Sequence, residues 1–551
     1  MPETRCRSVD RHVSLILMSE PQALLQLVLL LLALVLVLGA LAKRLPIPYP
    51  IALVLGGLVL ALIPGLPETH INKDVIFTLV LPPVIWAAAY ESDLRQLRRS
   101  AVSIAWLAIG LVVVTTVAVA LIAHFVMPEM PWTSAFILGS VVSSTDAVAA
   151  TSVAQRLGIP RRLIALLDGE SLLNDASSLV LYQTAVAARV SGHFTPGAVT
   201  IGFFYDAIVG VAVGIGVAYL VWWISRLTRD SLSSVALTLL AAYISWILGE
   251  KAHASAVLSC VACGLTMRRH FLTSSTAKTR VKTAEVWNLF VFILNGFIFV
   301  LLGLEWPRLV VDLPPGGLSS IALPTILVCI TVIVVRLAWT PLAVYGNLFL
   351  LFVPHHRRPP APPKGWLLVS GWTGMRGIVT LATALAVPTV SLSGQALPYR
   401  GRIVIISFAV ILVTLLLQGL TLAPLIKRLG LSDDGEGARE LALARRTALD
   451  ASVVQLDAIR SAGPADPQVV EMLRAYYVAR AARAREIAEE HTGEAHAPHS
   501  SLFSQRQELV DAQRQAVIQL WKEGAITDQT LANAAREIDL EELMFTARGE
   551  G

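Results

Sequence analysis

Long apolar stretches recur along this chain from residue 23 to residue 426. Hydrophobic residues make up 55% of the 551 residues and charged residues only 15%, against about 25% charged in a typical soluble domain. Because lipid offers the backbone no hydrogen bonds, stretches of roughly 20 apolar residues cross a bilayer as helices. The sequence therefore predicts an all-α polytopic membrane protein with about thirteen transmembrane helices. The predicted spans are 23–41, 47–63, 74–90, 101–126, 133–154, 161–190, 198–225, 232–249, 253–267, 284–304, 318–347, 366–390 and 402–426.

Basic residues gather in alternate loops between these spans. The positive-inside rule places such loops in the cytoplasm, and an odd number of spans then puts the C-terminus inside and the N-terminus outside. In a bilayer protein the net charge of +5 reflects this orientation and does not indicate nucleic-acid binding. We expect a multi-pass protein of the cell inner (plasma) membrane. The basic loops lie at 43–44, 95–99, 156–162, 226–229, 268–282, 355–364 and 427–428.

Composition divides the chain into three parts: a leader segment at 1–22, a transmembrane domain at 23–430 and a tail at 431–551. The leader is polar and basic, and Met18 is an alternative start. The tail contains no nucleotide-binding glycine loop, zinc-ligand spacing or catalytic triad, so we expect a cytoplasmic helical tail for regulation or assembly. Its apolar periodicity predicts amphipathic helices at 441–459, 467–490, 502–523 and 527–545, with a linker at 491–501.

Carboxylates lie inside two of the apolar spans. A charged side chain at mid-membrane costs roughly 2.5–3.5 kcal/mol on insertion scales, so such residues indicate an ion or proton path. In span 161–190, Glu170 and Asn174 are four residues apart, as are Ser171 and Asp175, so each pair stacks along one side of a helix. Hard cations such as Na⁺ prefer oxygen ligands of these kinds. The alternative is a polar network that only holds helices together.

Two further spans carry signs of interruption. Ser143, Ser144 and Thr145 precede Asp146 in the middle of span 133–154, and such hydroxyl residues compete for backbone hydrogen bonds and loosen helices. Mid-membrane backbone can be irregular only where it faces protein or a cavity. Asp146 would then lie against the N-terminus of a half-helix and be stabilised by its dipole. The alternative is an ordinary helix with a buried, protonated Asp146.

Two arginines complement these acids. Arg336 lies inside span 318–347, and Arg376 lies between two glycines inside span 366–390, where the glycines suggest a second break or close packing. A buried unpaired charge is very unfavourable, so each arginine needs a carboxylate or free helix-end carbonyls. We predict that Glu170 pairs with Arg336 and that Arg376 offsets the charge of the helix breaks, which leaves Asp175 free to exchange partners.

The two interrupted spans are the fifth and the twelfth, seven spans apart. An odd offset would make spans 1–6 and 8–13 inverted repeats, the transporter arrangement with a binding site at the midplane.

Three strings of this sequence resemble the monovalent cation:proton antiporter-1 family, the sodium/proton exchangers. They are GESLLNDA at 169–176, SSTDAVA at 143–149 and GMRGIVTLA at 374–382, and the resemblance covers Leu24 to Leu429. It implies thirteen spans, inverted repeats, two crossed broken helices, a homodimer, and elevator-like motion of a core domain against a dimerisation domain. One departure is Ala147, because the family commonly has proline after the Thr-Asp pair.

The resemblance also implies roles for individual residues. Asp175 corresponds to the essential carboxylate, and Asn174 marks the electroneutral branch. The implied Na⁺ ligands are Asp175, Ser171, Asp146 and Thr145, the last through its carbonyl. The family's core ion pair corresponds to Glu170 and Arg336.

Together these features predict a secondary transporter that exchanges Na⁺ for H⁺ by alternating access, with the two ions competing for Asp175. It would be no enzyme and would need no cofactor, and its partners would be Na⁺ (or Li⁺ or K⁺), H⁺, the lipid bilayer and a second copy of the chain. The alternatives are a K⁺/H⁺ antiporter of the same fold, a cation channel, and a transporter-like sensor. An intramembrane enzyme fits poorly, because His124, His193 and His253 lie near span ends and none neighbours a plausible serine nucleophile.

Overall fold

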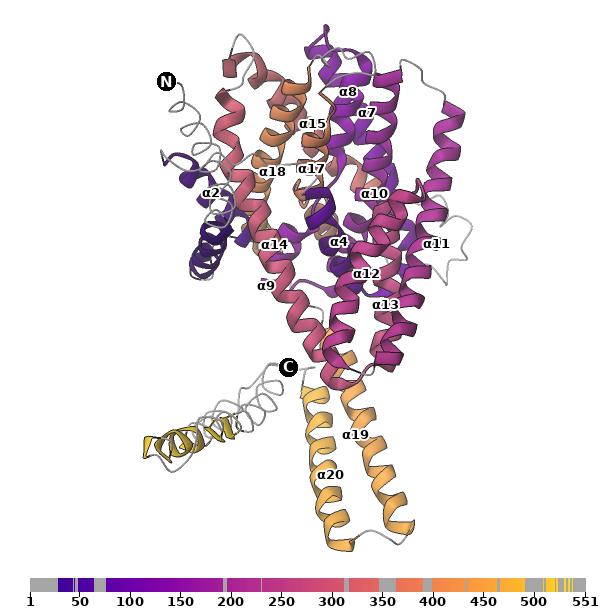
Figure 1. Cartoon of the computed structure of the whole chain (residues 1–551), viewed down its shortest axis with the longest axis vertical. Helices are drawn as coiled ribbons and strands as arrows, with labels where there is room; N and C mark the ends of the chain where they lie inside the picture. Colours follow the sequence, from indigo (N-terminus) through magenta and orange to yellow (C-terminus); the bar gives the residue numbers. More distant parts are fainter. Residues whose placement is uncertain are drawn as a thin grey trace, which may run out of the picture. The chain divides into compact units, whose positions relative to one another are not determined.

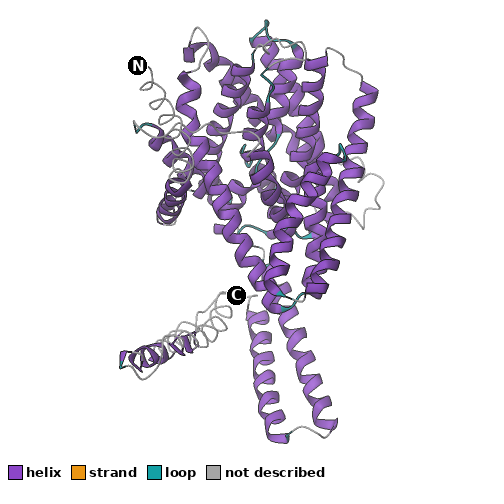
Figure 2. Ribbon diagram, viewed as in Figure 1, coloured by secondary structure: helices purple, strands orange, loops and turns teal. Residues whose placement is uncertain are grey.

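Helices are the only regular elements in the part of the chain that the computed structural model describes (Figure 2). The all-α prediction is therefore confirmed. The leader at 1–22, the linker at 491–501 and most of the last two predicted tail helices lie outside the described residues. The structure describes 28–42, 44, 48–63, 76–191, 196–228, 230–311, 317–345, 363–389, 399–431, 433, 435–462, 466–490 and scattered positions between 509 and 538.

The chain divides into two compact units, Met1–Ser432 and Asp433–Gly551. In the second unit, α19 (Glu436–Ala462) and α20 (Pro467–Glu490) pack together as a hairpin. An ion pair joins them, with Arg474 Nε 2.9 Å from Asp457 Oδ1. The tail is helical where it is described, as its periodicity predicts.

Each predicted span overlaps a helical segment of the first unit (Figure 1). Seven helices in the described ranges are long and apolar enough to cross a membrane, and Val28–Ala42 and α2 (Tyr49–Ala61) are shorter apolar helices. The exact count of thirteen stays a prediction. The unbroken helices are α4 (Leu81–Glu91), α7 (Leu111–Val126), α10 (Arg161–Ser191), α11 (Pro196–Thr228), α12 (Ser231–Lys251), α13 (Ala256–Ser274), α14 (Ala277–Val311), α15 (Gly317–Tyr345) and α18 (Arg400–Arg428).

Several helices run past the predicted ends of their spans. For example, α14 begins at Ala277, whereas the apolar stretch begins near residue 284. The added residues at its start include Lys278 and Arg280, which are exposed, and Lys282, which is half-buried. Hydrophobicity limits only the part of a helix that lies in hydrocarbon, so polar residues can extend it on either side.

Two spans are interrupted in mid-course. α8 (Trp132–Ser143) ends before an extended turn at Ser144–Asp146, and α9 (Ala147–Arg156) follows. α16 (Lys364–Trp372) likewise ends before Thr373–Gly377, and α17 (Ile378–Ala386) follows. The two breaks touch, because the backbone N–H of Asp146 donates to the carbonyl oxygen of Met375 at 2.8 Å.

The helices of the first unit pack in two groups. One group pairs α2 with α14 and packs α11, α12 and α4 around α13. The other pairs α7 with α8 and α15, packs α10 on α8, and places α18 against α15, α17 and α8 (Figure 1). At the α2–α14 crossing, a Cβ on Gly57 would lie 2.2 Å from the carbonyl oxygen of Val300, so glycine is what allows the backbones to approach.

Candidate functional site

α10 presents four polar side chains within two turns at its centre. Glu170 and Asn174 are each only 1% exposed, and Ser171 and Asp175 are half-buried beside them. The helix is continuous here, so its backbone bonds are satisfied and only its side chains face the neighbouring elements. As their spacing predicts, these residues form one oxygen-rich patch along α10.

Glu170 pairs with Arg336 of α15. Arg336 Nη2 lies 3.0 Å from Glu170 Oε2, Nη1 contacts Oε1, and Arg336 Nε donates to the carbonyl of Ser370 at 3.2 Å. Both side chains are 2% exposed. This bidentate geometry supplies the compensation that two buried charges need. The pair ties α10, α15 and the end of α16 together, and these are the two residues that the sequence leads us to pair.

The first helix break lies directly against α10. The Thr145 hydroxyl donates to Glu170 Oε1 at 3.1 Å and accepts from Asn174 Nδ2 at 2.5 Å. The Thr145 carbonyl accepts from Ser171 Oγ at 3.1 Å and from Asn174 Nδ2 at 3.2 Å. Ser144 Oγ donates to Asp175 Oδ1 at 2.5 Å. Ser144 and Thr145 of the break are thus each hydrogen-bonded to polar residues of α10.

Asp146 lies where the two breaks meet. Its Oδ1 accepts the backbone N–H of Val148 at 2.8 Å, in the first turn of α9, as expected of an acid at a helix N-terminus. Its Oδ2 is buried and has no hydrogen-bond partner among the described residues. A Cβ on Gly377 would lie 1.8 Å from that Oδ2, so the second break fits around the carboxylate only because residue 377 is glycine.

Arg376 is fully buried and contacts main-chain oxygens. Its Nε donates to the carbonyl of Val142, in the last turn of α8, at 2.8 Å, and its Nη1 donates to the carbonyl of Gly374. Helix C-termini carry unpaired carbonyls and partial negative charge, which a guanidinium satisfies. Arg376 therefore lies at both breaks, where the sequence predicts its charge to be needed.

The arrangement suits a small cation and a proton. Asp175, Asp146, Ser171 and the Thr145 carbonyl offer hard oxygen atoms, and Asp146 Oδ2 and Asn174 Oδ1 are buried acceptors to which no described residue donates. Among the described residues, no three His, Cys, Asp or Glu side chains form a group that could hold a metal ion.

The sequence does not assign some of the residues that build this site. Ser144 lies in the SSTDAVA motif, but the sequence predicts no role for it. Thr380 has no predicted role either, and its hydroxyl donates to the Ser144 carbonyl at 3.3 Å. Met375 contributes through its carbonyl, which no residue type could signal. The contact of Gly377 with Asp146 cannot be predicted from the sequence, because it forms only where the two breaks meet.

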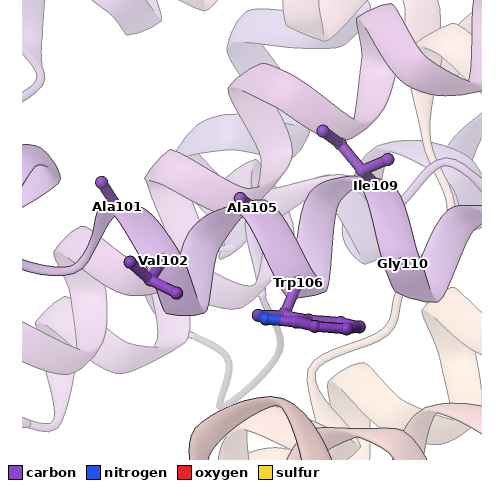
Figure 3. Close-up of a pocket in the computed structure, with 6 residues that line it drawn as sticks. All are labelled: Ala101, Val102, Ala105, Trp106, Ile109 and Gly110. Carbon is purple, nitrogen blue, oxygen red and sulfur yellow. The ribbon is translucent and has the colours of Figure 1, made fainter. Parts of the chain in front are cut away.

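A cavity of about 510 Å³ lies elsewhere, beside residues 101–110 (Figure 3). Its lining is apolar and includes Trp106, Ile109 and Gly110. None of the site carboxylates lines it, so it is not a candidate for ion binding. The buried thiols Cys260 and Cys263 are free, in line with their interpretation as small core residues.

Comparison with known proteins agrees with these features. The family model "Sodium/hydrogen exchanger, transmembrane" matches residues 30–428. An uncharacterized Na⁺/H⁺ exchanger of Mycobacterium tuberculosis is 31% identical over 92% of this chain and 93% of its own length. A sodium, potassium, lithium and rubidium/H⁺ antiporter of Bacillus pumilus is 29% identical over 68% of this chain and 57% of its own.

A solved structure shows a similar fold. The sodium proton antiporter MjNhaP1 of Methanocaldococcus jannaschii matches 73% of this chain and 98% of its own, with a TM-score of 0.55 and 18% identity. The fold, the two crossed breaks and the match of residues 30–428 lead to one conclusion: this multi-pass membrane protein belongs to the sodium/hydrogen exchanger family.

Proposed function

We propose that the protein exchanges Na⁺ for H⁺ across the membrane by secondary active transport. One observation carries the proposal: Asp175, held by Ser144, and the unpartnered Oδ2 of Asp146 both lie at the crossing of two broken helices. Broken helices at mid-membrane are the usual way in which transporters expose backbone and carboxylate oxygens to an ion. Membership of the exchanger family and the names of its relatives support the same proposal.

In this mechanism Na⁺ and H⁺ compete for Asp175. A cation would be held by Asp175, Asp146, Ser171 and the carbonyl of Thr145, and Asn174 would orient Thr145. A proton on Asp175 neutralises it equally well. The loaded site can cross the apolar barrier at lower cost than the bare carboxylate, because a free charge in hydrocarbon is strongly disfavoured. Alternating access then couples the two ions without ATP.

Glu170 and Arg336 play a structural part in this scheme. Their charges are mutually compensated, so they hold α10 against α15 and take no part in the ion cycle. Arg376 compensates the carbonyl ends of both breaks. Asp175, beside Asn174, is the acid that is free to exchange partners. Because it carries either one Na⁺ or one H⁺, we propose an electroneutral exchange of one Na⁺ for one H⁺.

The arrangement in the cell is part of the proposal. The basic loops support a plasma-membrane protein with its tail in the cytoplasm. The offset of seven between the two interrupted spans supports thirteen spans arranged as inverted repeats. Because the helices pack in two groups, we propose that one group moves against the other during transport. We also propose that the chain forms a homodimer, which holds the stationary group in place.

A second candidate substrate is K⁺. The Bacillus relative is named as an antiporter of sodium, potassium, lithium and rubidium, and the ligand types here suit any of these ions. A cation channel or a sensor would use the same acids without coupling them to protons.

The test is Asp175→Asn. Everted vesicles from a host without its own antiporters would be energised, and a pH-sensitive dye would report proton movement on addition of Na⁺, Li⁺ or K⁺. We expect cation-driven proton movement in the wild type and none in Asp175→Asn, because the amide can neither bind a proton nor bring charge to the cation. Asp230→Asn, at a helix cap where Asn serves as well as Asp, is the matched control. Exchange retained in Asp175→Asn would refute the mechanism.

A further inference from the structure

Gln418 stands in the middle of α18 as a buried amide without a partner. The residue is 1% exposed, and neither Oε1 nor Nε2 has a hydrogen-bond partner among the described residues. A buried polar group left unpaired destabilises a fold, so native proteins rarely keep one unless water, an ion or a function accounts for it. The proposed ion cycle does not use this residue.

Gln418 lies on the part of α18 that contacts the second helix break. Four residues before it, Thr414 Oγ1 accepts the backbone N–H of Arg376 at 3.2 Å. Three residues after it, Thr421 Oγ1 accepts the indole N–H of Trp372 at 2.9 Å. Residues at i, i+4 and i+7 share one face of a helix, so Gln418 lies between two points of α18 that contact 372–376.

The break offers groups that such an amide can serve. The carbonyl of Gly374 accepts from Arg376 and that of Met375 accepts from Asp146, but the carbonyls of Trp372 and Thr373 accept no hydrogen bond from described residues. They lie at the C-terminal end of α16, where helix carbonyls need partners from outside the helix.

We propose that Gln418 is a positioning residue that holds internal water against the carbonyls of Trp372 and Thr373. Water fits this set because each molecule can donate two hydrogen bonds, to a carbonyl or to Oε1, and can also accept one from Nε2. A cation would satisfy only the oxygens and would leave Nε2 unpaired. Hydration here fixes the backbone leading to Met375, whose carbonyl holds Asp146 at 2.8 Å. Gln418 thus acts on the ion site through the second break.

The inference rests on the proposed exchange, since its effect on transport passes through Asp146. Gln418→Met removes the amide and keeps a side chain of similar length. We expect it to raise the apparent KM for Na⁺ about two- to tenfold, the factor that one hydrogen bond is worth, with a smaller change in maximal rate. Gln418→Asn should stay near wild type, because a water-mediated contact tolerates a side chain shorter by one methylene.

Leu417→Met is the matched control, since Leu417 neighbours Gln418 but is 45% exposed on the outer face of α18. An unchanged KM in Gln418→Met would overturn the inference, and so would an equal rise in Leu417→Met. KM does not depend on how much protein inserts, so reduced folding of a variant does not imitate the effect. No exchange by the wild type would refute the proposed function, whereas wild-type exchange with an unaltered KM in Gln418→Met would refute only the role of Gln418.

A direct measurement covers the case in which Gln418→Met does not fold. High-resolution cryo-electron microscopy of the wild-type protein in buffers with and without Na⁺ should show density within hydrogen-bond distance of Gln418 Nε2 in both. Density only with Na⁺ would mean a cation and would overturn the assignment of water, and empty space in both maps would overturn the site itself.

Discussion

Ala147 forms a hydrogen bond that proline could not. Its backbone N–H donates to Ser171 Oγ at 3.2 Å, across the first break. Proline at this position would keep the start of α9, because the first residue of a helix tolerates its missing N–H. The departure from the family's usual residue therefore leaves the break intact and adds one constraint on a proposed cation ligand.

We expect Ala147→Pro to fold and to lower the apparent KM for Na⁺. Without the Ala147 donor, a lone pair of Ser171 Oγ is released toward the cation, and the effect should not exceed about tenfold, the value of one hydrogen bond. The measurement is a Na⁺ titration of exchange in vesicles, with Ser171→Ala alongside as the variant that lacks the ligand. A higher KM in Ala147→Pro would show that the Ala147 bond orients Ser171 and does not compete with the ion.

Gly377→Ala should disrupt the ion site from the second break, through its contact with Asp146. The new Cβ would lie 1.8 Å from Asp146 Oδ2, a distance that forces the carboxylate or the break to move. We expect a loss of Na⁺-driven exchange of at least about tenfold, since displacement of a positioned group by 1 Å or less changes function strongly. Gly401→Ala is the control, because a Cβ there meets nothing within 4 Å. Normal exchange in Gly377→Ala would mean that Asp146 is not a ligand.

At this scale the sequence was most informative where residue type carries charge. Glu170, Asp175 and Arg336 stand out because carboxylates and guanidinium groups are costly in lipid. The contributions of Met375 and Ala147 come from the main chain, which every residue shares, so no letter of the sequence predicts them. Gln418 is also absent from the prediction, since an amide in an apolar helix resembles an ordinary polar contact between helices.

Among the elements, α10 and α15 are joined by a pair of charges buried in lipid-embedded protein. The pair links the helix that carries Asp175 to the helix behind it, and Arg336 also holds the end of α16 through the Ser370 carbonyl. The spacing of the acids along α10 and the position of Arg336 in an apolar span were enough to anticipate the contact. The helix ends were not predictable to the residue, because polar residues outside the hydrocarbon extend helices without an apolar signal.

We expect Arg336→Met to destabilise the protein by about 3–5 kcal/mol, because it leaves Glu170 buried without compensation. The double variant Glu170→Gln/Arg336→Met should recover most of that loss, since a neutral amide still accepts from Thr145. Thermal unfolding of the purified proteins in detergent measures both effects. A single variant as stable as wild type would show that Glu170 does not depend on its partner.

On the scale of the whole molecule, the two units have separate interiors. Among the described residues, the hydrogen bonds and the ion pair of the candidate site come from α8 to α10, α15 to α18 and the breaks between them, within the first unit. The last predicted apolar stretch ends at residue 426, and the first unit ends at Ser432. The crossing of the breaks was implied by the family resemblance and not by any local pattern, because it joins residues more than 200 positions apart in sequence.

Truncation after Ser432, the last residue of the first unit, should therefore leave Na⁺-driven exchange intact, within about twofold of the rate per inserted molecule. The dye assay on vesicles, normalised to the amount of protein in the membrane, tests this. A changed dependence on pH or Na⁺ with the rate preserved would identify the tail as a regulator. Abolished exchange in a correctly inserted truncation would make the tail part of the transport machinery.

The bond between the Asp146 N–H and the Met375 carbonyl has a consequence for how such a protein can diversify. Both groups belong to the main chain, so the bond does not require a particular side chain at position 146 or 375. Substitution of side chains can change the oxygen atoms offered to an ion while the two helix breaks stay hydrogen-bonded to each other. Ion selectivity and the stability of the fold can thus change independently of one another among related proteins.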